Sequence, residues 1–299
     1  MNRRVVVTIA TYKRPDLLEE LLDSLEVARR EHPFTAIIID NDAGGSAHEV
    51  ALRFGHFASY SVEPVAGIVA ARNAALNLLD DETSHIAFVD DDETVPPHWM
   101  RDLMAAVDEF EADIVCGPVQ SVFPRDAPAW VQRGGYIQRS AEARGVTSRS
   151  PATNNTLMSR RLLDRAGRPR FDESFSQTGG SDTEFFSRLK ALDPVIVWIP
   201  EAAVSERVPL DRLTFKWIMR RYIRINNVSG RIILETTSRR SLAMRATTSI
   251  LIGVPKTALA LVRGQGLRLV DTSYITRGIG WWGAVRNRVV QEYARPDSQ

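Results

Sequence analysis

The 299-residue sequence has little cysteine and lacks several common markers of function. Its single cysteine, Cys116, cannot form an internal disulfide, and its apolar neighbours indicate a buried, unreactive thiol in a reducing compartment. The five histidines have no spacing typical of a zinc site. No Gly-x-Gly-x-x-Gly follows the first expected strand and no Walker A motif is present, which argues against dinucleotide oxidoreduction and P-loop phosphoryl transfer.

Long apolar runs are also missing from the sequence. The short run near the N-terminus stops at Tyr12, so it predicts a first strand rather than a signal peptide. No segment reaches the ~20 apolar residues of a spanning helix, and residues 246–262, which come close, are interrupted by Pro255 and Lys256. We therefore expect a protein that is made and kept in the cytoplasm.

The composition, 44% hydrophobic and 25% charged, is that of an ordinary globular protein with one large domain or a domain and an appendage. The net charge of +1 conceals an asymmetry. Residues 201–299 contain 17 Lys or Arg and 7 Asp or Glu, a balance of +10, whereas residues 1–200 contain 21 and 30, a balance of −9. The two parts are expected to face different partners.

Short β-branched runs alternate with amphipathic segments along the first half of the sequence. This pattern is typical of an α/β fold with a mostly parallel central sheet flanked by helices. Strands are expected at 5–9, 36–39, 58–62, 86–89, 113–123, 156–159 and 195–199, and helices at 15–30, 48–54, 67–79, 99–110 and 183–192. Residues 124–150 are rich in Pro, Gly, Arg and Ser, which predicts a long mobile loop of the kind that often forms a lid.

An acidic run, Asp90-Asp91-Asp92-Glu93, directly follows the expected strand 86–89. Open α/β sheets bind ligands beyond the carboxyl ends of their strands. Adjacent carboxylates repel one another unless a cation offsets them, and oxygen ligands suit Mg²⁺ or Mn²⁺. The alternative is a solvated acidic turn, which describes most charge runs.

Asp90-x-Asp92 resembles the metal motif of family 2 inverting glycosyltransferases, which have an A-type glycosyltransferase fold. Three further blocks resemble the family in the expected order, so the likeness covers at least residues 4–226. It implies a UDP-sugar donor and a divalent metal, Mn²⁺ or Mg²⁺. The metal would be held by Asp90 and Asp92, with Asp90 and Asp91 also beside the donor.

The first two of these blocks lie at the ends of the first two strands. Thr8-Ile-Ala-Thr-Tyr-Lys-Arg-Pro resembles the family's opening strand and loop, which cradle the uracil and ribose. Ile39-Asp40-Asn41-Asp42 resembles the strand end that reads the base, although a simple Asx-turn is the alternative. The implied donor contacts are Thr11, Tyr12, Arg14, Asp40, Asn41 and Asp42.

The other two blocks supply charge for the diphosphate and a base. Gly67-Ile-Val-Ala-Ala-Arg72-Asn73 is similar to a family segment in which Arg72 would hold the diphosphate, although a helix arginine is usually a surface residue. Thr178-Gly-Gly-Ser-Asp182-Thr-Glu184 resembles the family's Glu-Asp motif, so Asp182 aligns with the catalytic base while Ser181 stands where glutamate is usual. The alternative is a capping box formed by Ser181 and Glu184.

Four side chains are expected on the acceptor side: Trp130, Asn154, Asn155 and Glu184. Trp130 lies in the predicted loop and would stack on an acceptor sugar, or else serve as a buried anchor. The two asparagines precede an expected strand.

The basic C-terminal part is expected to be helical. Residues 211–226 form a basic amphipathic pattern that resembles bacterial exopolysaccharide glucosyltransferases of the succinoglycan type, and Arg220 and Arg221 would reach the donor diphosphate or a lipid phosphate. Residues 246–262 and 274–290, which include Trp281-Trp282, predict helices at the surface of an anionic membrane. The alternative is a helical subdomain packed on the core.

Together these patterns predict a catalytic domain at 1–226 and a basic, amphipathic helical extension at 227–299 that associates with the membrane. The expected activity is inverting transfer of a hexose from a UDP-sugar to a hydroxyl of a lipid-linked glycan, in bacterial polysaccharide or glycolipid synthesis. The expected location is cytoplasmic, peripheral on the inner face of the plasma membrane. The alternative function is a non-catalytic membrane- or nucleic-acid-binding protein with a degenerate sheet domain, and the acidic first part argues against nucleic acid.

Overall fold

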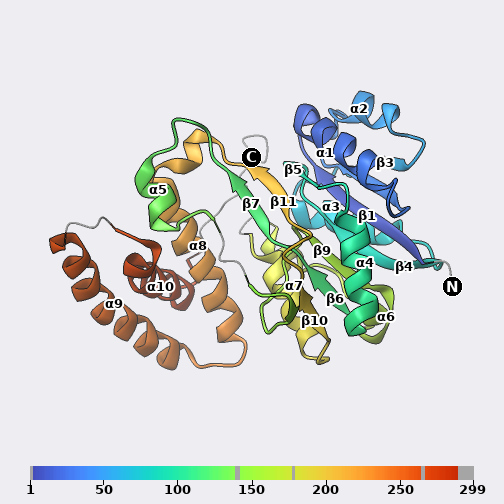
Figure 1. Cartoon of the computed structure of the whole chain (residues 1–299). Coiled ribbons are helices and arrows are strands. Elements are labelled where there is room, and N and C mark those ends of the chain that lie inside the picture. The colour runs from blue at the N-terminus through green and yellow to red at the C-terminus, as the bar shows by residue number, and fades with distance from the viewer. Residues whose placement is uncertain (1–2, 139–141, 177–178, 264–266, 289–299) are drawn as a thin grey trace. The chain divides into compact units, whose positions relative to one another are not determined.

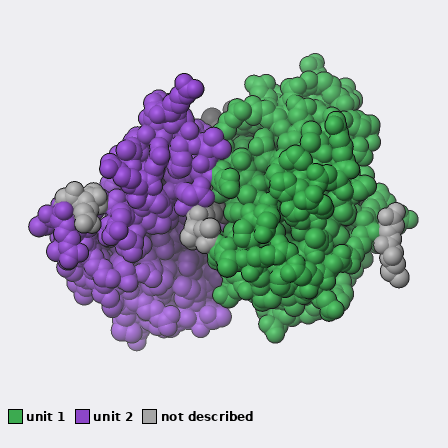
Figure 2. Space-filling view, viewed as in Figure 1, with its two compact units in different colours: residues 1–120, 140–176, 181–207 green, residues 121–139, 177–180, 208–299 purple. Residues whose placement is uncertain are grey.

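The computed structural model describes residues 3–138, 142–176, 179–263 and 267–288. The chain divides into two compact units, which are coloured separately in Figure 2. Unit 1 contains residues 1–120, 140–176 and 181–207, and unit 2 contains residues 121–139, 177–180 and 208–299. This division differs from the expected boundary at residue 226, which falls inside the continuous helix α8 (Phe215–Leu234).

Unit 1 is built on an eight-stranded sheet with the order β3-β2-β1-β4-β9-β6-β10-β8 (Figure 1). Its strands are β1 (Arg4–Thr11), β2 (Thr35–Asp40), β3 (Ala58–Val62), β4 (Thr83–Phe88), β6 (Ile114–Cys116), β8 (Gly145–Val146), β9 (Thr156–Ser159) and β10 (Ile196–Trp198). Strand β9 runs antiparallel to both β4 and β6, and β8 is antiparallel to β10. The other neighbouring pairs are parallel, which confirms the predicted mostly parallel sheet.

Helices cover both faces of this sheet because side chains along the buried strands alternate between the faces. On β1, Val5 and Val7 join the cluster that contains the buried leucines of α1 (Pro15–Ala28), whereas Val6 packs with Ala71 of α3 (Ile68–Asn77). The remaining helices of unit 1 are α2 (His48–Arg53), α4 (Trp99–Phe110), α6 (Arg160–Arg165) and α7 (Ser181–Lys190). Pro15 occupies the start of α1, as predicted, where its missing N–H has no cost.

The strand expected at 113–123 is interrupted at Gly117-Pro118, which separates β6 from β7 (Val119–Val122). A Cβ on Gly117 would lie 2.3 Å from both the Asn155 side chain and the Ala202 carbonyl oxygen, so only glycine fits this crossing. Strand β7 belongs to a three-stranded sheet with β5 (Glu93–Thr94) and β11 (Val204–Arg207). The loop expected at 124–150 contains α5 (Ala129–Gly134) and β8, so it is not free of regular structure.

Unit 2 consists mainly of α5, a 3₁₀ turn at Leu210–Leu213, and three long helices, α8, α9 (Arg239–Val262) and α10 (Leu269–Val285). Helix α10 lies between α8 and α9 (Figure 1). The expected helix at 211–226 begins at residue 215, where Thr214 caps the first turn, and it continues to residue 234. Of the helix expected at 274–290, residues 289 and 290 lie outside the described residues. Among the described helices, none is long and apolar enough to cross a membrane.

Candidate active site

Three polar blocks meet at the carboxyl edge of the sheet because β1, β2 and β4 are parallel neighbours. Thr11 ends β1 opposite Asp40 at the end of β2. Its hydroxyl also donates a 2.8 Å hydrogen bond to Oδ2 of Asp91, which follows β4. The first block is thereby tied to the acidic run, as the shared strand direction predicts.

Asp91 points into the protein rather than out of it. Besides Thr11, Arg14 approaches its Oδ1 at 3.3 Å, and the same guanidinium lies 3.2 Å from Oδ2 of Asp92. Burial raises the pKa of Asp91 to about 6, against the opposing effects of Arg14 and Thr11. Asp91 therefore holds the acidic loop to β1 and to the start of α1, and its predicted contact with the donor remains a prediction.

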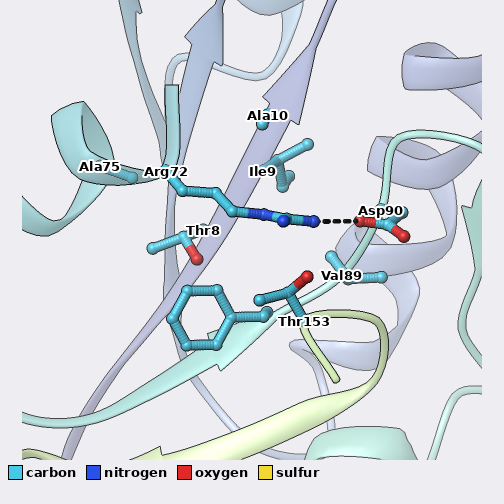
Figure 3. Close-up of a pocket in the computed structure, with 9 residues that line it drawn as sticks. Thr8, Ile9, Ala10, Arg72, Ala75, Val89, Asp90 and Thr153 are labelled. Carbon is cyan, nitrogen blue, oxygen red and sulfur yellow. Dashed lines mark ion pairs between the residues drawn. The ribbon is translucent and has the colours of Figure 1, made fainter. Parts of the chain in front are cut away.

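Asp90 lines a hollow together with Arg72 (Figure 3). The remaining lining residues are Thr8, Ile9, Ala10, Ala75, Phe88, Val89 and Thr153. The Nη2 atom of Arg72 lies 3.7 Å from Oδ1 of Asp90. Desolvation raises the pKa of Asp90 to about 7 although Arg72 opposes this change. The side chain is 42% exposed.

Glu93 is a buried member of the acidic run to which the sequence assigned no role of its own. Its Oε2 accepts a 3.0 Å hydrogen bond from the backbone N–H of Asp90, and its own N–H donates to the Asp90 carbonyl. Desolvation, and then the nearby charge of Asp90, raise the pKa of Glu93 well above its ordinary value. The side chain thus closes the turn that carries Asp90 to Asp92. In the sequence, this role was indicated only by the position of Glu93 as the fourth acid after a buried strand.

Arg72 links the hollow to the helix that carries the predicted base. Its Nη1 donates a 3.2 Å hydrogen bond to the Ser181 hydroxyl, and its guanidinium lies 5.7 Å from the centre of the Phe171 ring. Only 14% of the side chain is exposed, so Arg72 is not an ordinary surface arginine. Asp182 follows Ser181 directly, and its Oδ1 accepts a hydrogen bond from the backbone N–H of Thr183.

The capping box expected from Ser181 and Glu184 does not form. Ser181 is the first residue of α7, and both carboxylate oxygens of Glu184 pair with Arg188, at 2.5 and 2.9 Å. Arg188 also donates to the carbonyl oxygen of Arg170. Glu184 therefore positions Arg188, which links α7 to the segment that contains Arg170. The expected place of Glu184 on the acceptor side gains no support.

Asp40 is fully buried, and its carboxylate accepts three hydrogen bonds from its own surroundings. Oδ1 accepts from the N–H of Asp42 at 3.0 Å, and Oδ2 accepts from the N–H of Ala47 and the hydroxyl of Tyr60. These contacts are those of the Asx-turn alternative. Asp42, which is partly buried, is the carboxylate of this block that reaches the surface. The predicted role of Asp40 in base reading receives no support.

Asn41 joins the second block to the third. Its Oδ1 accepts a 2.8 Å hydrogen bond from the N–H of Gly67, and its Nδ2 donates to the carbonyl oxygens of Glu63 and Val65. Gly67 has φ = 129°, and a Cβ there would lie 2.1 Å from the Ser176 hydroxyl oxygen. The glycine at the head of α3 is required by this geometry, which sets the direction of the helix carrying Arg72.

The other predicted contacts are distributed between the two units. Asn155 is fully buried: its Oδ1 accepts from Trp99 Nε1, and its Nδ2 donates to two carbonyl oxygens, so its side chain serves the core rather than an acceptor. Asn154 is half-buried before β9, and Tyr12 is half-buried in the loop after β1.

Trp130, Arg220 and Arg221 belong to unit 2. The Trp130 ring packs against Tyr136 and Phe215, with ring centres 5.6 and 6.2 Å apart, as expected of an anchor. Arg220 and Arg221 lie on α8, and the Arg221 guanidinium lies 5.3 Å from the centre of the Trp217 ring. Their predicted ligand contacts remain predictions.

Among the described residues, no group of three or more His, Cys, Asp or Glu side chains is placed to hold a metal ion. The pair Asp90 and Asp92 provides only two carboxylates. Mg²⁺ is usually bound through one or two carboxylates together with substrate phosphates, so a two-carboxylate motif matches that mode of binding. The metal predicted from the acidic run remains a prediction.

The sheet order, with an acidic loop after the fourth strand and an arginine beside it, defines an A-type glycosyltransferase fold. The sequence model described as Glycosyl transferase family 2 matches residues 6–167, more than half of the chain. The chain belongs to this family, which confirms the resemblance predicted from its sequence blocks.

Two relatives illustrate the range of similarity. "Succinoglycan biosynthesis protein ExoM" of Rhizobium meliloti (strain 1021) is 32% identical over 236 residues, which cover 77% of this chain and 75% of that protein. "Glycosyltransferase GlyA" of Streptococcus pneumoniae serotype 4 (strain ATCC BAA-334 / TIGR4) is 24% identical over 120 residues, covering 39% of this chain and 17% of that protein. The first alignment covers most of both chains.

Solved structures share the fold at low sequence identity. The crystal structure of S. aureus TarS 1-349 has a TM-score of 0.55 and 15% identity, covering 98% of this chain and 93% of that chain. The same protein in complex with UDP-GlcNAc has a TM-score of 0.57 at 14% identity, with the same coverage. These likenesses establish the fold that places the strand ends together.

Proposed function

We propose that this glycosyltransferase moves a hexose from a UDP-sugar to a hydroxyl of a glycan acceptor, with inversion at the anomeric carbon. The observation that carries the proposal is the position of Arg72, between Asp90 of the acidic motif and Ser181 next to Asp182. The Arg72 guanidinium thus adjoins both the expected diphosphate site and the expected base. The UDP-GlcNAc complex of TarS supports a UDP-sugar donor, and the name of ExoM supports a polysaccharide product.

Asp182 is proposed as the general base. It would accept the proton of the acceptor hydroxyl while the oxygen of that hydroxyl attacks the anomeric carbon and the bond to UDP breaks. Arg72, with its planar, permanently charged guanidinium, would bind the diphosphate and oppose the charge that develops on it. No general acid is needed because the nucleoside diphosphate leaves as an anion.

A divalent cation, Mn²⁺ or Mg²⁺, is proposed to bind Asp90 and Asp92. Both offer hard oxygen ligands, and the raised pKa of Asp90 reflects desolvation together with crowded negative charge that a cation would relieve. When bound, the metal would supply charge neutralisation at the departing diphosphate. Asp91 and Glu93 would keep the two ligands in place through their internal hydrogen bonds.

The acceptor is proposed to be a lipid-linked glycan, met at the inner face of the plasma membrane by a cytoplasmic, peripheral enzyme. The support for this part is the +10 charge balance of residues 201–299 and the helices that they form. A basic helical surface attracts anionic lipids, which would bring the catalytic unit to its acceptor.

The test is a panel of UDP-, GDP- and dTDP-hexoses, supplied to the purified full chain with membrane lipid extracts as acceptors, with Mn²⁺, with Mg²⁺ or with EDTA. The proposal expects transfer from one UDP-hexose to an extracted lipid, with an inverted linkage, and its loss in EDTA. Activity that survives EDTA would remove the metal from the proposal. A chain that binds oligonucleotides and neither binds nor consumes any UDP-sugar would establish the non-catalytic alternative.

A further inference from the structure

The helix α9 exposes large apolar side chains on the side that faces away from its neighbours. Only a narrow stripe of this helix is buried, formed by Leu242, Ala246, Ser249 and Gly253 at spacings of four and three residues. The side chains of Met244, Leu251 and Val262 are 67%, 69% and 85% exposed. Their spacings of seven and eleven residues place them on one line along the opposite side.

We call this line, with the 48%-exposed Leu259 beside it, the outer face of α9. It is defined by Met244, Leu251, Leu259 and Val262. Helix α10 packs on the other side of α9 (Figure 1).

Glycine and serine residues allow a close approach of α9 and α10. A Cβ on Gly253 would lie 2.8 Å from the Ile275 side chain, and one on Gly278 would lie 2.4 Å from the Ile250 side chain. The Ser249 hydroxyl donates to the Tyr274 carbonyl oxygen at 2.8 Å. Helices in water normally bury their large apolar residues, whereas the buried residues of α9 are mostly small or polar and several of its large apolar residues are exposed, as in helices that contact lipid.

The charge around this helix pair is almost entirely positive. Residues 239–288 contain nine Lys or Arg and a single acid, Asp271, which pairs with Arg268 at 3.6 Å. Arg245, Lys256 and Arg263 are separated by eleven and seven residues, so they line one flank of the outer face. An apolar face with a cationic flank matches the two layers of an anionic membrane surface, apolar chains below anionic headgroups.

We infer that the outer face of α9 is the surface that binds an anionic lipid bilayer, with the helix lying in the plane of the headgroups. This inference rests on the proposed function, in which the acceptor is met at a membrane, and it names the surface that makes the contact. A second copy of the chain fits the outer face less well, because both copies would bring the same excess of positive charge. Binding in the interface also agrees with the absence of a spanning helix from the described residues.

The test is flotation of the full chain with phosphatidylcholine vesicles containing 0% or about 30% phosphatidylglycerol, a content that brings the surface potential into the physiological range. Wild type is expected to float with the anionic vesicles, and Leu251→Glu is expected to bind them about tenfold more weakly because it places a charge in the apolar layer. Leu52→Glu on α2 is the matched control, since Leu52 is 67% exposed but belongs to unit 1. This variant should bind within about twofold of wild type.

A second pair of variants separates charge from apolar contact. Arg245→Gln with Arg263→Gln is expected to weaken binding to anionic vesicles by about tenfold or more and to reduce its salt dependence. Equal binding by wild type, Leu251→Glu and the arginine variant would overturn the inference. So would a concentration-dependent dimer, measured by light scattering, that Leu251→Glu abolishes.

Hydrolysis of the UDP-sugar in detergent-free buffer is measured on the same samples. It tests the proposed donor independently of vesicle binding, which tests the lipid surface. Donor turnover by a wild-type chain that does not bind vesicles would overturn the lipid surface and leave the transferase proposal intact. Leu251-dependent vesicle binding by a chain that turns over no nucleotide sugar would support the lipid surface and refute the proposed donor.

Discussion

Arg72 donates a hydrogen bond to the hydroxyl of Ser181 at 3.2 Å while its other terminal nitrogen lies 3.7 Å from Asp90. Ser181 occupies the position where the family pattern has glutamate. A hydroxyl orients the guanidinium without neutralising it, whereas a carboxylate would cancel part of its charge. The departure from the pattern therefore places a neutral partner on the Ser181 side of Arg72, and under the proposed function the guanidinium would bind the diphosphate.

Replacing this arginine by lysine is expected to impair donor binding despite the retained charge. The Arg72→Lys variant loses the planar fork that reaches Asp90 and Ser181 together, so affinity for UDP and kcat/KM should each fall by about tenfold or more. Calorimetric titration with UDP and initial rates measure the two effects. Arg53→Lys, at a surface pair with Glu19, is the control and should change neither. An unchanged UDP affinity in Arg72→Lys would remove Arg72 from the donor site.

The exchange of Asp182 for asparagine tests the assigned base. Asp182→Asn keeps the shape of the side chain and its acceptor oxygen for the N–H of Thr183, but it cannot take a proton. We expect kcat to fall by about 10²–10⁴-fold with UDP affinity nearly unchanged. Asp193→Asn, beyond the far end of the same helix, is the matched control. Normal turnover by Asp182→Asn would assign the base to another group.

The raised pKa of Asp90 makes the stability of the metal-free protein depend on pH. A folded-state pKa of about 7 against an ordinary 3.8 means that the folded protein holds the proton more tightly, so this stabilisation is present below about pH 4 and is lost as pH rises through 7. Asp90→Asn remains neutral, so its Tm should exceed that of wild type at pH 8 and differ less at pH 5. Because the side chain is partly exposed, solvent screening limits the expected rise to about 2–4 °C.

Thermal melts with and without Mn²⁺ complete this test. If Asp90 is a metal ligand, Mn²⁺ should raise the Tm of wild type at pH 8 more than that of Asp90→Asn. Asp126→Asn, at an exposed carboxylate of unit 2, serves as the control and should follow wild type under all conditions. A wild-type Tm that rises steadily between pH 5 and 8 relative to Asp90→Asn would contradict the expected loss of stability on ionisation of Asp90.

An alanine at Gly67 is expected to destabilise the protein. The backbone φ of 129° is strained for any residue with a Cβ, and that atom would lie 2.1 Å from the Ser176 hydroxyl oxygen. The free energy of unfolding should fall by about 1–3 kcal/mol, measured by urea denaturation. Gly55→Ala is the matched control, because the nearest atom to its Cβ would be the Leu52 carbonyl oxygen at 3.4 Å. Equal stability of the two variants would refute the geometric requirement at Gly67.

Much of the fold was predictable because its signals are local. The β-branched runs that predicted strands at 5–9, 36–39, 58–62 and 86–89 correspond to β1, β2, β3 and β4, and Pro15 marked the start of α1. Hydrophobic periodicity within a few residues determines such elements. By contrast, α6 and the break at Gly117-Pro118 were missed, because the close approach of Asn155 and Ala202 to Gly117 comes from distant parts of the chain.

The chemical groups at the strand ends can be identified from the sequence, which contains hydroxyl, carboxylate and guanidinium groups in the order typical of the family. Which of these groups line the hollow depends on contacts that form in the folded chain. Asp90 lines the hollow, Asp91 turns inward to Thr11 and Arg14, and Asp40 is held by Ala47 and Tyr60. Chemically identical carboxylates differ only in their burial and their partners, and those partners come from other elements of the fold.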